Sequence, residues 1–399
     1  MNSYHNKYGF ERHCWAEIDL DALRDNFAYV RQVAGGPVCA VVKADAYGHG
    51  DRMVSRELEG MGVRWFGVSN LEEGASLRAA GVQGEILIFG YTPPSMAAEL
   101  AALNITQAVF NGDYARELNE AAVRAGVRVK GHLKVDTGMG RIGFPCESAD
   151  EICACCRLPG LEISGIFSHF SSSDDLTPAG QEYTRMQKAR FDAVVEGLKR
   201  RGIDIPFRHL QNSAGIVSYP ECSYEAVRAG VILYGQGLPF LPGHGLPLRP
   251  VMSLCSIVAM VKTVKTGDCI SYSRTFTAPR EMRVATIPIG YADGYLRAFS
   301  NRADVLIRGR RARVIGNVCM DQLMVDVSHI PDVRVDDRVT LAGRDGDEEI
   351  TFSELAGIAG TIHYELLCLV GKRVPRVYLR GGEIVKVWDM NRLGREEGR

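Results

Sequence analysis

Eight short apolar runs rich in β-branched residues recur through the first part of the chain and alternate with stretches of helical, amphipathic spacing. The runs are Val38–Ala44, Trp65–Ser69, Glu85–Gly90, Ile105–Phe110, Val127–Val135, Leu161–Phe170, Phe207–Gln211 and Val227–Leu233. Strands that alternate with helices in this way indicate parallel strands joined by crossover helices. Eight such units over roughly 230 residues match the size of one (β/α)8 barrel of the TIM type.

Glycines mark the ends of the predicted helices. Three of these helices span Leu71–Ala80, Tyr114–Ala125 and Thr184–Arg201, and a glycine directly follows each one. Glycine at that place adopts the left-handed conformation that closes a helix. An open, doubly wound sheet is the alternative arrangement. Its dinucleotide-binding version is excluded, because no GxGxxG follows the first strand.

After about residue 245 the pattern changes to short strand-like runs joined by Gly/Asp turns, with one short predicted helix, Ser353–Ala359. The runs are Ser253–Thr266, Arg283–Ile289, Ala303–Gly309, Arg313–Val318, Leu323–Val327 and Arg338–Ala342. We therefore expect an α/β protein with a barrel over residues 13–244 and a mostly-β C-terminal domain over residues 245–390. Residues 1–12 are expected to pack on that domain, Pro242–Pro247 to form the boundary, and 391–399 to be a disordered tail.

The composition narrows the possible partners and location. The net charge of −1 gives no electrostatic basis for binding nucleic acid or an anionic membrane surface. The N-terminus has no apolar signal core, and no stretch is long and apolar enough to span a bilayer. The eleven cysteines lack paired metal-binding spacing, so we expect no metal and reduced, mostly buried thiols. These features predict a cytoplasmic protein.

Lys43 lies at the end of the first predicted strand, within AVVKADAYGHG (Ala40–Gly50). In a barrel of this kind the carboxyl ends of the strands face the active site. A lysine that loses part of its solvation there has a lowered pKa, and its amine becomes available for Schiff-base chemistry. From position alone, a lysine that simply reaches water at the strand end is the more ordinary interpretation.

Other strands also end in polar groups. His169 lies at the end of the sixth predicted strand, Ser213 follows the seventh, and the eighth carries Arg228 and Gly230. In this fold a phosphate site commonly lies in the loops after strands seven and eight, where glycine lets backbone N–H groups approach the ligand. A bulge in a strand explains Gly230 equally well. Together, a Schiff-base lysine and a phosphate site suggest pyridoxal phosphate (PLP).

The motifs of the chain resemble those of the bacterial alanine racemase family, from about Ala16 to Tyr378. The matching segments, in family order, are AVVKADAYGHG, KVDTGMGRIGF, SHF, NSA, RAGVILYG, SYSRTFTA, PIGYADGY, CMDQ and HYELLCLVGKRVPR. The resemblance implies a PLP-dependent isomerase with a barrel and a C-terminal β domain. It also implies that the enzyme interconverts L- and D-alanine and supplies D-alanine for peptidoglycan in the cell wall.

The resemblance implies two catalytic bases that act on opposite faces of the substrate α-carbon. Lys43 forms the internal aldimine with PLP and acts on one face of the substrate α-carbon, and Tyr272 in SYSRTFTA acts on the other face. A free tyrosine titrates near ~10, so a nearby cation is expected to help it work near neutrality. In the family this tyrosine comes from the other subunit, which implies a head-to-tail homodimer with shared active sites.

Four further residues support catalysis or bind substrate by resemblance. Arg228 faces the pyridine nitrogen and keeps it unprotonated, because an arginine does not give up its proton. His169 links that arginine to the tyrosine. Arg141 binds the substrate carboxylate with bidentate geometry. Lys134, seven positions earlier, matches a lysine that is carbamylated in many family members.

The remaining site residues are also assigned by resemblance. The cofactor phosphate and ring are expected to be held by Tyr47, Asn212, Ser213, Gly230, Val231 and Tyr364. Met320 and Asp321 reach the partner's active site, with the Met320 backbone N–H at the substrate carboxylate, and Tyr291 lies at the substrate entrance. Without the motifs, core packing in the β domain would be the default interpretation of Met320 and Tyr291.

The family's segment SYGxTYTA is SYSRTFTA here, with Ser273 in place of glycine and Phe276 in place of tyrosine. Tyr272 is kept, so the departure bears on loop geometry. A serine or broad-specificity racemase on the same scaffold is the nearest alternative function, and the presence of Tyr364 favours alanine. A barrel-fold decarboxylase would carry a GGG run, which is absent. A non-catalytic PLP-binding protein would lack the β domain.

Overall fold

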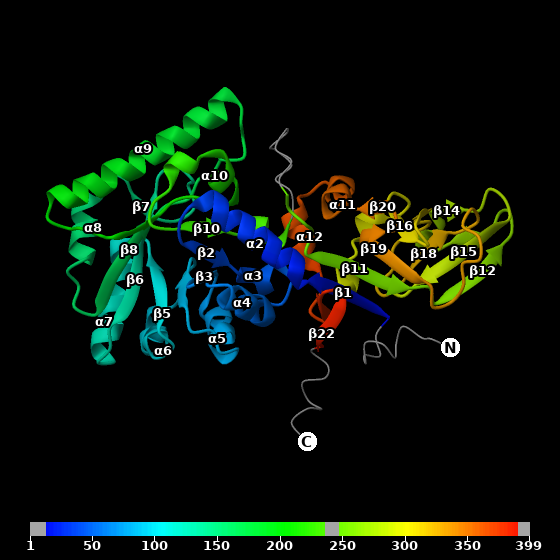
Figure 1. The fold of residues 1–399 in the computed structure, drawn as a ribbon, viewed down its shortest axis with the longest axis horizontal. Coiled ribbons are helices and arrows are strands. Elements are labelled where there is room, and N and C mark those ends of the chain that lie inside the picture. Colours follow the sequence, from blue (N-terminus) through cyan, green and yellow to red (C-terminus); the bar gives the residue numbers. More distant parts are fainter. Residues whose placement is uncertain (1–12, 236–246, 390–399) are drawn as a thin grey trace, which may run out of the picture. The chain divides into compact units, whose positions relative to one another are not determined.

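The computed structural model describes residues 13–235 and 247–389 and divides into two compact units (Figure 1). Among the described residues, the barrel unit comprises 23–46, 51–235 and 247–249, and the β unit comprises 13–22, 47–50 and 250–389. The predictions made for residues 1–12, for the tail 391–399 and for most of the boundary segment lie outside the described residues.

Eight parallel strands form the barrel unit, which confirms the predicted fold class. They are β2 (Val38–Val41), β3 (Trp65–Val68), β4 (Glu85–Ile88), β5 (Ile105–Val109), β6 (Val129–Asp136), β8 (Leu161–Phe167), β9 (Phe207–His209) and β10 (Val227–Ala229). Their order is β10-β2-β3-β4-β5-β6-β8-β9, and a two-residue strand, β7 (Phe144–Pro145), pairs with β6. The Arg228 amide on β10 donates to the carbonyl of Gln211, two residues after β9, at 3.1 Å, which links the two ends of this order.

Seven of the eight predicted runs contain one of these strands, and the run Val127–Val135 overlaps β6, because strands covered on both faces read as continuous apolar runs. The seven strands end earlier than predicted, whereas β6 ends one residue later, at Asp136. The run that was expected to continue to Ala44 leaves the sheet after Val42, whose amide still donates to the Gly67 carbonyl. Beyond it the backbone turns into the left-handed region, which a strand does not tolerate.

Helices cover the barrel strands, as Figure 1 shows for α4, α5, α6 and α7. The helices of eight or more residues that carry barrel-unit residues are α2 (Leu20–Ala34), α4 (Asp51–Gly60), α5 (Leu71–Ala79), α7 (Gly112–Arg124) and α9 (Pro178–Arg200). Shorter ones are α3 (Lys43–Tyr47), α6 (Ala97–Ala102), α8 (Ala149–Cys155) and α10 (Ser213–Ser218). The predicted terminating glycines, Gly81, Gly126 and Gly202, all have positive φ angles, between 67° and 88°. None of the described helices is long and apolar enough to cross a membrane.

The β unit is built on a sheet of order β17-β16-β19-β11-β1-β21-β22, with β20 paired to β19. The strands are β1 (Cys14–Asp19), β11 (Met252–Ile257), β16 (Asp304–Ile307), β17 (Arg310–Arg313), β19 (Arg338–Asp345), β20 (Glu348–Ile350), β21 (Arg376–Arg380) and β22 (Glu383–Trp388). Two smaller sheets are β12 (Met260–Val264), β15 (Met282–Ile287) and β18 (Leu323–Asp326), and the pair β13 (Cys269–Ile270) and β14 (Phe276–Thr277).

Strand β1 corrects the expected start of the barrel at residue 13. It pairs antiparallel with β11 and parallel with β21, so it belongs to the β unit. The physical reason is burial of Trp15, which packs in a cluster with Cys255, Ile257 and Val377. A single run of six residues does not reveal in sequence which distant strands it will join.

Two local predictions in the β unit were wrong. In the segment expected as a strand over Arg313–Val318, Arg313 ends β17 and Val314 forms an isolated bridge to Val325. The unit also has two described α-helices where one was expected, α11 (Phe352–Ala359) and α12 (His363–Leu369). Helix α12 has no side-chain cap at Ile362, so the usual start signal is missing from its sequence.

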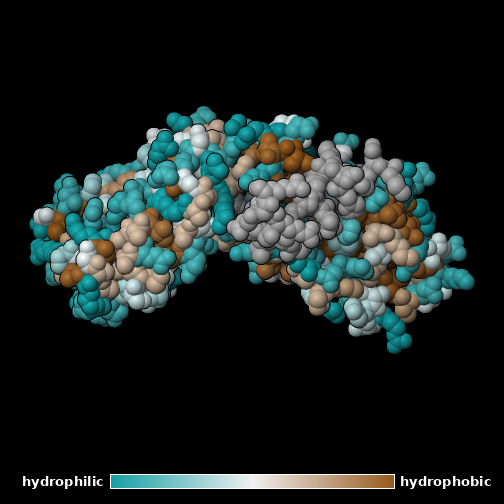
Figure 2. All heavy atoms as spheres, turned by 90° about the horizontal axis from the view of Figure 1, so that it is seen from below, coloured by the Kyte–Doolittle hydropathy of each residue, from teal (hydrophilic) through white to brown (hydrophobic). Residues whose placement is uncertain are grey.

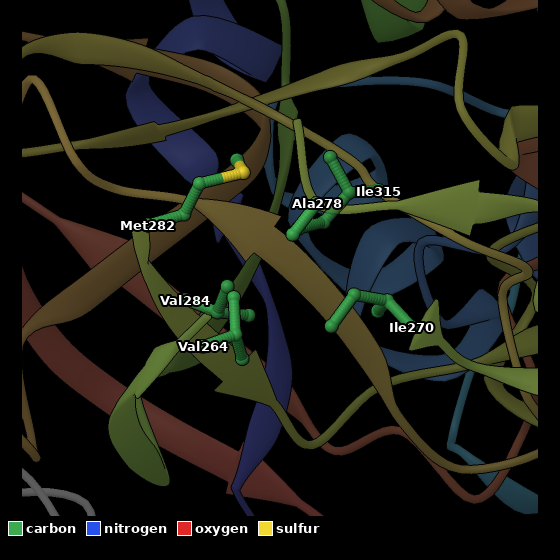
Figure 3. Packing of buried hydrophobic residues seen from close by; sticks show 6 residues of the cluster. All are labelled: Val264, Ile270, Ala278, Met282, Val284 and Ile315. Atoms are coloured by element: carbon green, nitrogen blue, oxygen red, sulfur yellow. The ribbon is translucent and has the colours of Figure 1, made fainter. Parts of the chain in front are cut away.

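The apolar residues of the β unit pack inside it. Figure 3 shows six side chains of one buried cluster, with Val264 and Val284 side by side on β12 and β15. Ile270, in the same cluster, lies two residues before Tyr272 and so anchors the start of that loop. On the face drawn in Figure 2, hydrophilic atoms predominate and apolar atoms form separate patches.

Candidate functional site

Lys43 opens a left-handed turn at the carboxyl end of β2. Residues Ala44 to Tyr47 all have φ between 52° and 56°, a conformation that costs a residue other than glycine roughly 1–2 kcal/mol. Hydrogen bonds hold the turn: the Ala46 amide donates to the Val42 carbonyl at 2.9 Å and the Ala44 amide to Glu73 Oε1 at 2.8 Å. Such strain persists only where the surroundings enforce it, and it is common at functional sites. The Lys43 side chain is half-buried.

Arg228 on β10 is the buried centre of the barrel-unit site. Its Nη1 donates to the His209 carbonyl at 3.0 Å, and its Nη2 donates to the carbonyls of Ser168 and Leu210 at 2.7 and 2.9 Å. The guanidinium also lies 5.5 Å from the centroid of the Phe167 ring. Burial lowers the pKa of Arg228 to about 10, so the side chain stays charged at neutral pH.

Arg228 also fixes the protonation of two histidines. Its Nη2 is 3.1 Å from Nδ1 of His169 and its Nη1 is 2.8 Å from Nδ1 of His209. Because a guanidinium has only donors, both Nδ1 atoms must accept, which assigns the ring proton of each neutral histidine to Nε2. His209 Nε2 then donates to Nδ1 of His132, 3.0 Å away.

Four positive side chains act on His169, and all four are predicted site residues. Burial lowers the pKa of His169 well below its usual range, and the charges of Arg228, Lys134, Arg141 and Lys43 lower it further. His169 is therefore neutral at pH 7. The barrel unit brings together the side chains that were predicted at the ends of strands one, five, six and eight.

Lys134 on β6 is buried beside these cations. Its Nζ lies 5.1 Å from the centroid of the Phe167 ring, and it reaches the Val135 carbonyl at 3.4 Å. Burial lowers the pKa of Lys134 well below its usual range, the charges of Arg228 and Arg141 lower it further, and only Asp136 acts in the opposite direction. Burial and the two neighbouring arginines therefore both act against the charged form of this amine.

Arg141 follows β6 in an exposed loop whose backbone is well ordered by hydrogen bonds. Oδ1 of Asp136 accepts from the amides of Gly138 and Met139, both at 2.9 Å, and from that of Gly140 at 3.1 Å. One carboxylate thus shapes the whole turn that carries Arg141. An exposed guanidinium with neighbouring positive charge suits the binding of a small carboxylate.

Ser213 and Gly230 lie together at the carboxyl ends of β9 and β10. The Gly230 amide donates to Ser213 Oγ at 3.0 Å, and the Ile232 amide does so at 3.5 Å. An accepting hydroxyl still has its own proton to donate, so Ser213 is suited to a phosphate oxygen. Asn212 takes a structural part instead: it caps α10 through the Gly215 amide and donates to the Phe170 carbonyl at 3.1 Å.

The two tyrosines predicted to bind the phosphate group lie in the β unit. The rings of Tyr47 and Tyr364 have centroids 6.4 Å apart. Burial raises the pKa of Tyr47, and Tyr364 and Cys368 raise it further, so its hydroxyl keeps its proton and is a donor. The two hydroxyl-bearing side chains form one polar corner of the β unit.

Tyr272, Tyr291 and Met320 are exposed on the β unit, with 67%, 41% and 53% of their surface accessible. Their loops are tied together by hydrogen bonds. Asn317 Nδ2 donates to the Tyr272 carbonyl at 2.7 Å, and the Tyr291 amide donates to the Cys319 carbonyl at 3.1 Å. Asp321, also predicted here, pairs with Arg373. Large apolar side chains left exposed together indicate a contact surface.

Sequence reasoning missed His132 and His209. Both were visible near the end of a predicted strand, but an isolated histidine in a strand carries no signal of its partner. They contact one another across 77 residues of sequence, and only the closing of the sheet brings them to Arg228. No group of three or more possible metal ligands lies together in residues 13–235 or 247–389.

Two family models match nearly the whole chain. The model of the alanine racemase N-terminal domain matches residues 18–237, and that of the alanine racemase C-terminal domain matches residues 251–378. Among curated proteins, the alanine racemase of Desulfovibrio desulfuricans is 46% identical over 377 residues, which cover 93% of this chain and 99% of that protein. The alanine racemase of Geobacter sulfurreducens is also 46% identical, over 371 residues.

Solved structures agree with these sequence matches. Alanine racemase from Clostridium difficile 630 superposes with a TM-score of 0.90 at 37% identity, covering 95% of this chain and 99% of that one. Alanine racemase from Bacillus anthracis with bound L-Ala-P gives a TM-score of 0.88 at 34% identity, covering 95% and 98%.

Proposed function

Because this chain belongs to the alanine racemase family, we propose that it interconverts L- and D-alanine with pyridoxal 5′-phosphate bound at Lys43 and with Lys43 and Tyr272 as opposed bases. The observation that carries the proposal is the set of cations around His169: Arg228, Lys134, Arg141 and Lys43. When bound, the cofactor draws electrons from the substrate α-carbon and makes its proton acidic.

The residues present fit that cofactor. Arg228 supplies a charged, buried donor for the pyridine nitrogen, held by three backbone carbonyls. Ser213 and the backbone of Gly230 and Val231 would hold the phosphate, with Tyr47 and Tyr364 as hydroxyl donors and Asn212 shaping the loop. Since an arginine does not release its proton at neutral pH, Arg228 would donate a hydrogen bond to the ring nitrogen without protonating it.

Racemisation needs a proton taken from one face of the α-carbon and another delivered to the opposite face. In our proposal the Lys43 amine serves one face and the Tyr272 hydroxyl the other. His169 supports the exchange: its Nδ1 accepts from Arg228, so its Nε2–H is the group left to contact Tyr272. The positive charges near His169 favour the ionised form of a tyrosine brought to them.

Substrate binding falls to Arg141, which would pair with the alanine carboxylate. The Met320 backbone N–H would add a donor, and Tyr291 would line the entrance. We also propose that Lys134 is carbamylated. Its buried amine lies among positive charges, and a carbamate there would change repulsion of Arg141 into attraction.

The exposure of Tyr272, Tyr291 and Met320 supports a head-to-tail homodimer in which a second copy of the chain supplies these residues to the site. Their apolar surface would be covered in that assembly. Asp321 would lie in the same interface.

The test is an alanine racemisation assay on purified protein, together with an absorbance scan for a lysine-bound cofactor. Lys43→Ala should abolish both signals. Tyr272→Phe should keep the absorbance and lose most of the activity, because the cofactor attachment is intact and one base is missing. Racemisation that survives Tyr272→Phe would refute the two-base assignment.

Serine is the competing substrate on this scaffold. A larger kcat/KM for serine than for alanine would assign the protein as a serine racemase. Release of carbon dioxide would indicate a decarboxylase. The cytoplasmic location and the supply of D-alanine to peptidoglycan stay predictions. Fractionation of cells and rescue of a D-alanine auxotroph would check them.

A further inference from the structure

Helix α9 lies on the outside of the barrel unit and packs against α8 (Figure 1). Three of its residues, Tyr183, Gln187 and Arg190, are spaced four and three positions apart, so they share one face of the helix. All three side chains bond to the segments that carry the predicted substrate and support residues. None of them was assigned a role from the sequence.

Gln187 is fully buried, with 0% of its surface accessible, and its side chain uses its complete hydrogen-bonding capacity. Nε2 donates to the His169 carbonyl at 3.1 Å and to Thr137 Oγ1 at 3.4 Å. Oε1 accepts from the amide and the hydroxyl of Ser171, at 2.9 and 3.1 Å. A carbonyl only accepts and an amide only donates, so the orientation of the Gln187 amide is determined by its partners.

The bond to Thr137 continues as a directed chain. Ser168 Oγ donates to the Val135 carbonyl at 2.7 Å, so it accepts from Thr137 Oγ1, 2.8 Å away. Thr137 in turn accepts from Gln187. Ser168 already joins the end of β8 to the end of β6, and Gln187 adds a further link between Thr137 and the His169 carbonyl from α9.

Two neighbours strengthen the contact on the β6 side. The Tyr183 hydroxyl donates to the Gly138 carbonyl at 2.6 Å, and Arg190 Nη1 donates to the Thr137 carbonyl at 3.2 Å. Both bonds act on the turn that Asp136 shapes and that leads to Arg141. Gln187 alone of the three contacts the His169 segment as well.

We propose that Gln187 is a positioning residue that fixes the Arg141 loop relative to His169 and so sets the affinity of the site for the substrate carboxylate. The proposal rests on the proposed function, because it takes Arg141 as the carboxylate-binding residue. Gln187 itself does not touch the substrate. Its effect passes through Thr137 and the His169 carbonyl.

The central experiment compares Gln187→Met with Gln181→Met in the holoenzyme. Methionine keeps the length of the side chain and removes its hydrogen bonds. Gln181 is on the same helix but bonds to the Leu176 carbonyl and to Arg185, away from the site. We expect Gln187→Met to raise KM for alanine about ten-fold with kcat changed less than about three-fold, and Gln181→Met to leave both unchanged.

A second measurement follows ligand binding and does not depend on catalytic turnover. Propionate carries the carboxylate of the substrate without its amine, and its affinity for the holoenzyme is measured by titration calorimetry. We expect about ten-fold weaker binding in Gln187→Met. Backbone hydrogen exchange at Gly138 to Gly140 should be faster in the same variant. A purely structural role would lower the unfolding midpoint and leave propionate binding unchanged, which would overturn the proposal.

Two further variants keep the outcome decisive. If Gln187→Met does not fold, Thr137→Val replaces it, because valine keeps the shape and removes Oγ1. Propionate binding at least about three-fold weaker would support the proposal, and unchanged binding would overturn it. Failure of the proposed function looks different. Wild-type holoenzyme would then not racemise alanine, or Arg141→Lys would leave propionate binding unchanged, while the exchange rates would still report on the Gln187 bonds.

Discussion

At the scale of single residues, Arg228 shows why one buried guanidinium has no simple substitute. Its fork spans the carbonyls of Ser168, His209 and Leu210, and it also sets the tautomers of two histidines. A lysine ammonium is a point donor and does not span these acceptors. The residue was identified from its motif, but the number of groups that depend on it was not.

Arg228→Lys is therefore expected to destabilise the fold as well as to lower activity. Each buried carbonyl left without a donor costs about 1–3 kcal/mol. Thermal unfolding of Arg228→Lys should be compared with that of Arg208→Lys, whose arginine forms a half-exposed ion pair with Glu225. Equal losses of stability in the two variants would contradict the assigned role of the buried fork.

His132 provides a prediction for pH dependence. Burial lowers the pKa of His132 to about 3. In the unfolded chain its pKa is about 6.5, so between these two values the unfolded state binds the extra proton and stability falls as pH falls. At pH 5 this single group costs about 2 kcal/mol relative to pH 7. Burial also lowers the pKa values of His169 and His209, which act in the same direction.

Urea unfolding at pH 7 and pH 5 checks this expectation. The wild type should lose stability between the two values, and His132→Gln should lose less, whatever its stability at pH 7. The comparison uses the difference in the free energy of unfolding between pH 7 and pH 5. The loss of the bond to His209 affects both values equally and cancels in that difference. An identical pH response in both proteins would exclude His132 as a contributor.

At the scale of elements, the loop of Tyr272 is a strained segment held by its neighbours. Ser271, Ser273 and Arg274 all have positive φ angles, of 67°, 59° and 52°. Ser271 Oγ donates to the Asn317 carbonyl at 2.6 Å, and Asn301 Nδ2 donates to Thr275 Oγ1 at 3.1 Å. These bonds keep the loop in a conformation that the side chains alone disfavour. They also explain how the loop keeps its shape although Ser273 replaces the family's glycine.

Ser273→Gly is accordingly expected to keep activity and to raise stability by up to about 1 kcal/mol, because glycine adopts this conformation without steric cost. Ser273→Val should lower kcat, since a β-branched residue is a steric outlier there. Ser223→Gly is the matched control. Ser223 is exposed and has a φ of −71°, so glycine there only adds freedom to the unfolded chain and lowers stability slightly. The measurements are thermal midpoints and kcat, and loss of activity in Ser273→Gly would contradict the expectation.

At the scale of the whole molecule, the proposed homodimer predicts complementation. A dimer of one Lys43→Ala chain and one Tyr272→Phe chain has one site with both bases intact. After denaturation and refolding of an equal mixture, half of the dimers are mixed and half of their sites are complete, so about a quarter of wild-type activity should return. Each variant refolded alone is the control. A mixture that stays inactive would contradict sharing of the site between copies.

Much of this architecture follows from local sequence pattern. Each barrel strand is a continuous apolar run, and helices α5, α7 and α9 are followed by glycines with positive φ. Residues close together in the sequence were therefore enough to locate these strands and helices. Lys43 and Arg228 were placed at strand ends by the same logic. Where the pattern is weak, as at α12, the prediction failed.

The sequence by itself determined the order of strands and helices, the residues at their ends and, through its motifs, the family. Only the tertiary structure decided that β1 joins β11 and β21, that His209 contacts both Arg228 and His132, and that Gln187 joins the Arg141 loop to His169. The physical reason is the separation in sequence between the residues that interact. Periodicity and capping act over a few residues, whereas these contacts join residues tens to hundreds of positions apart and exist only once the sheets have formed.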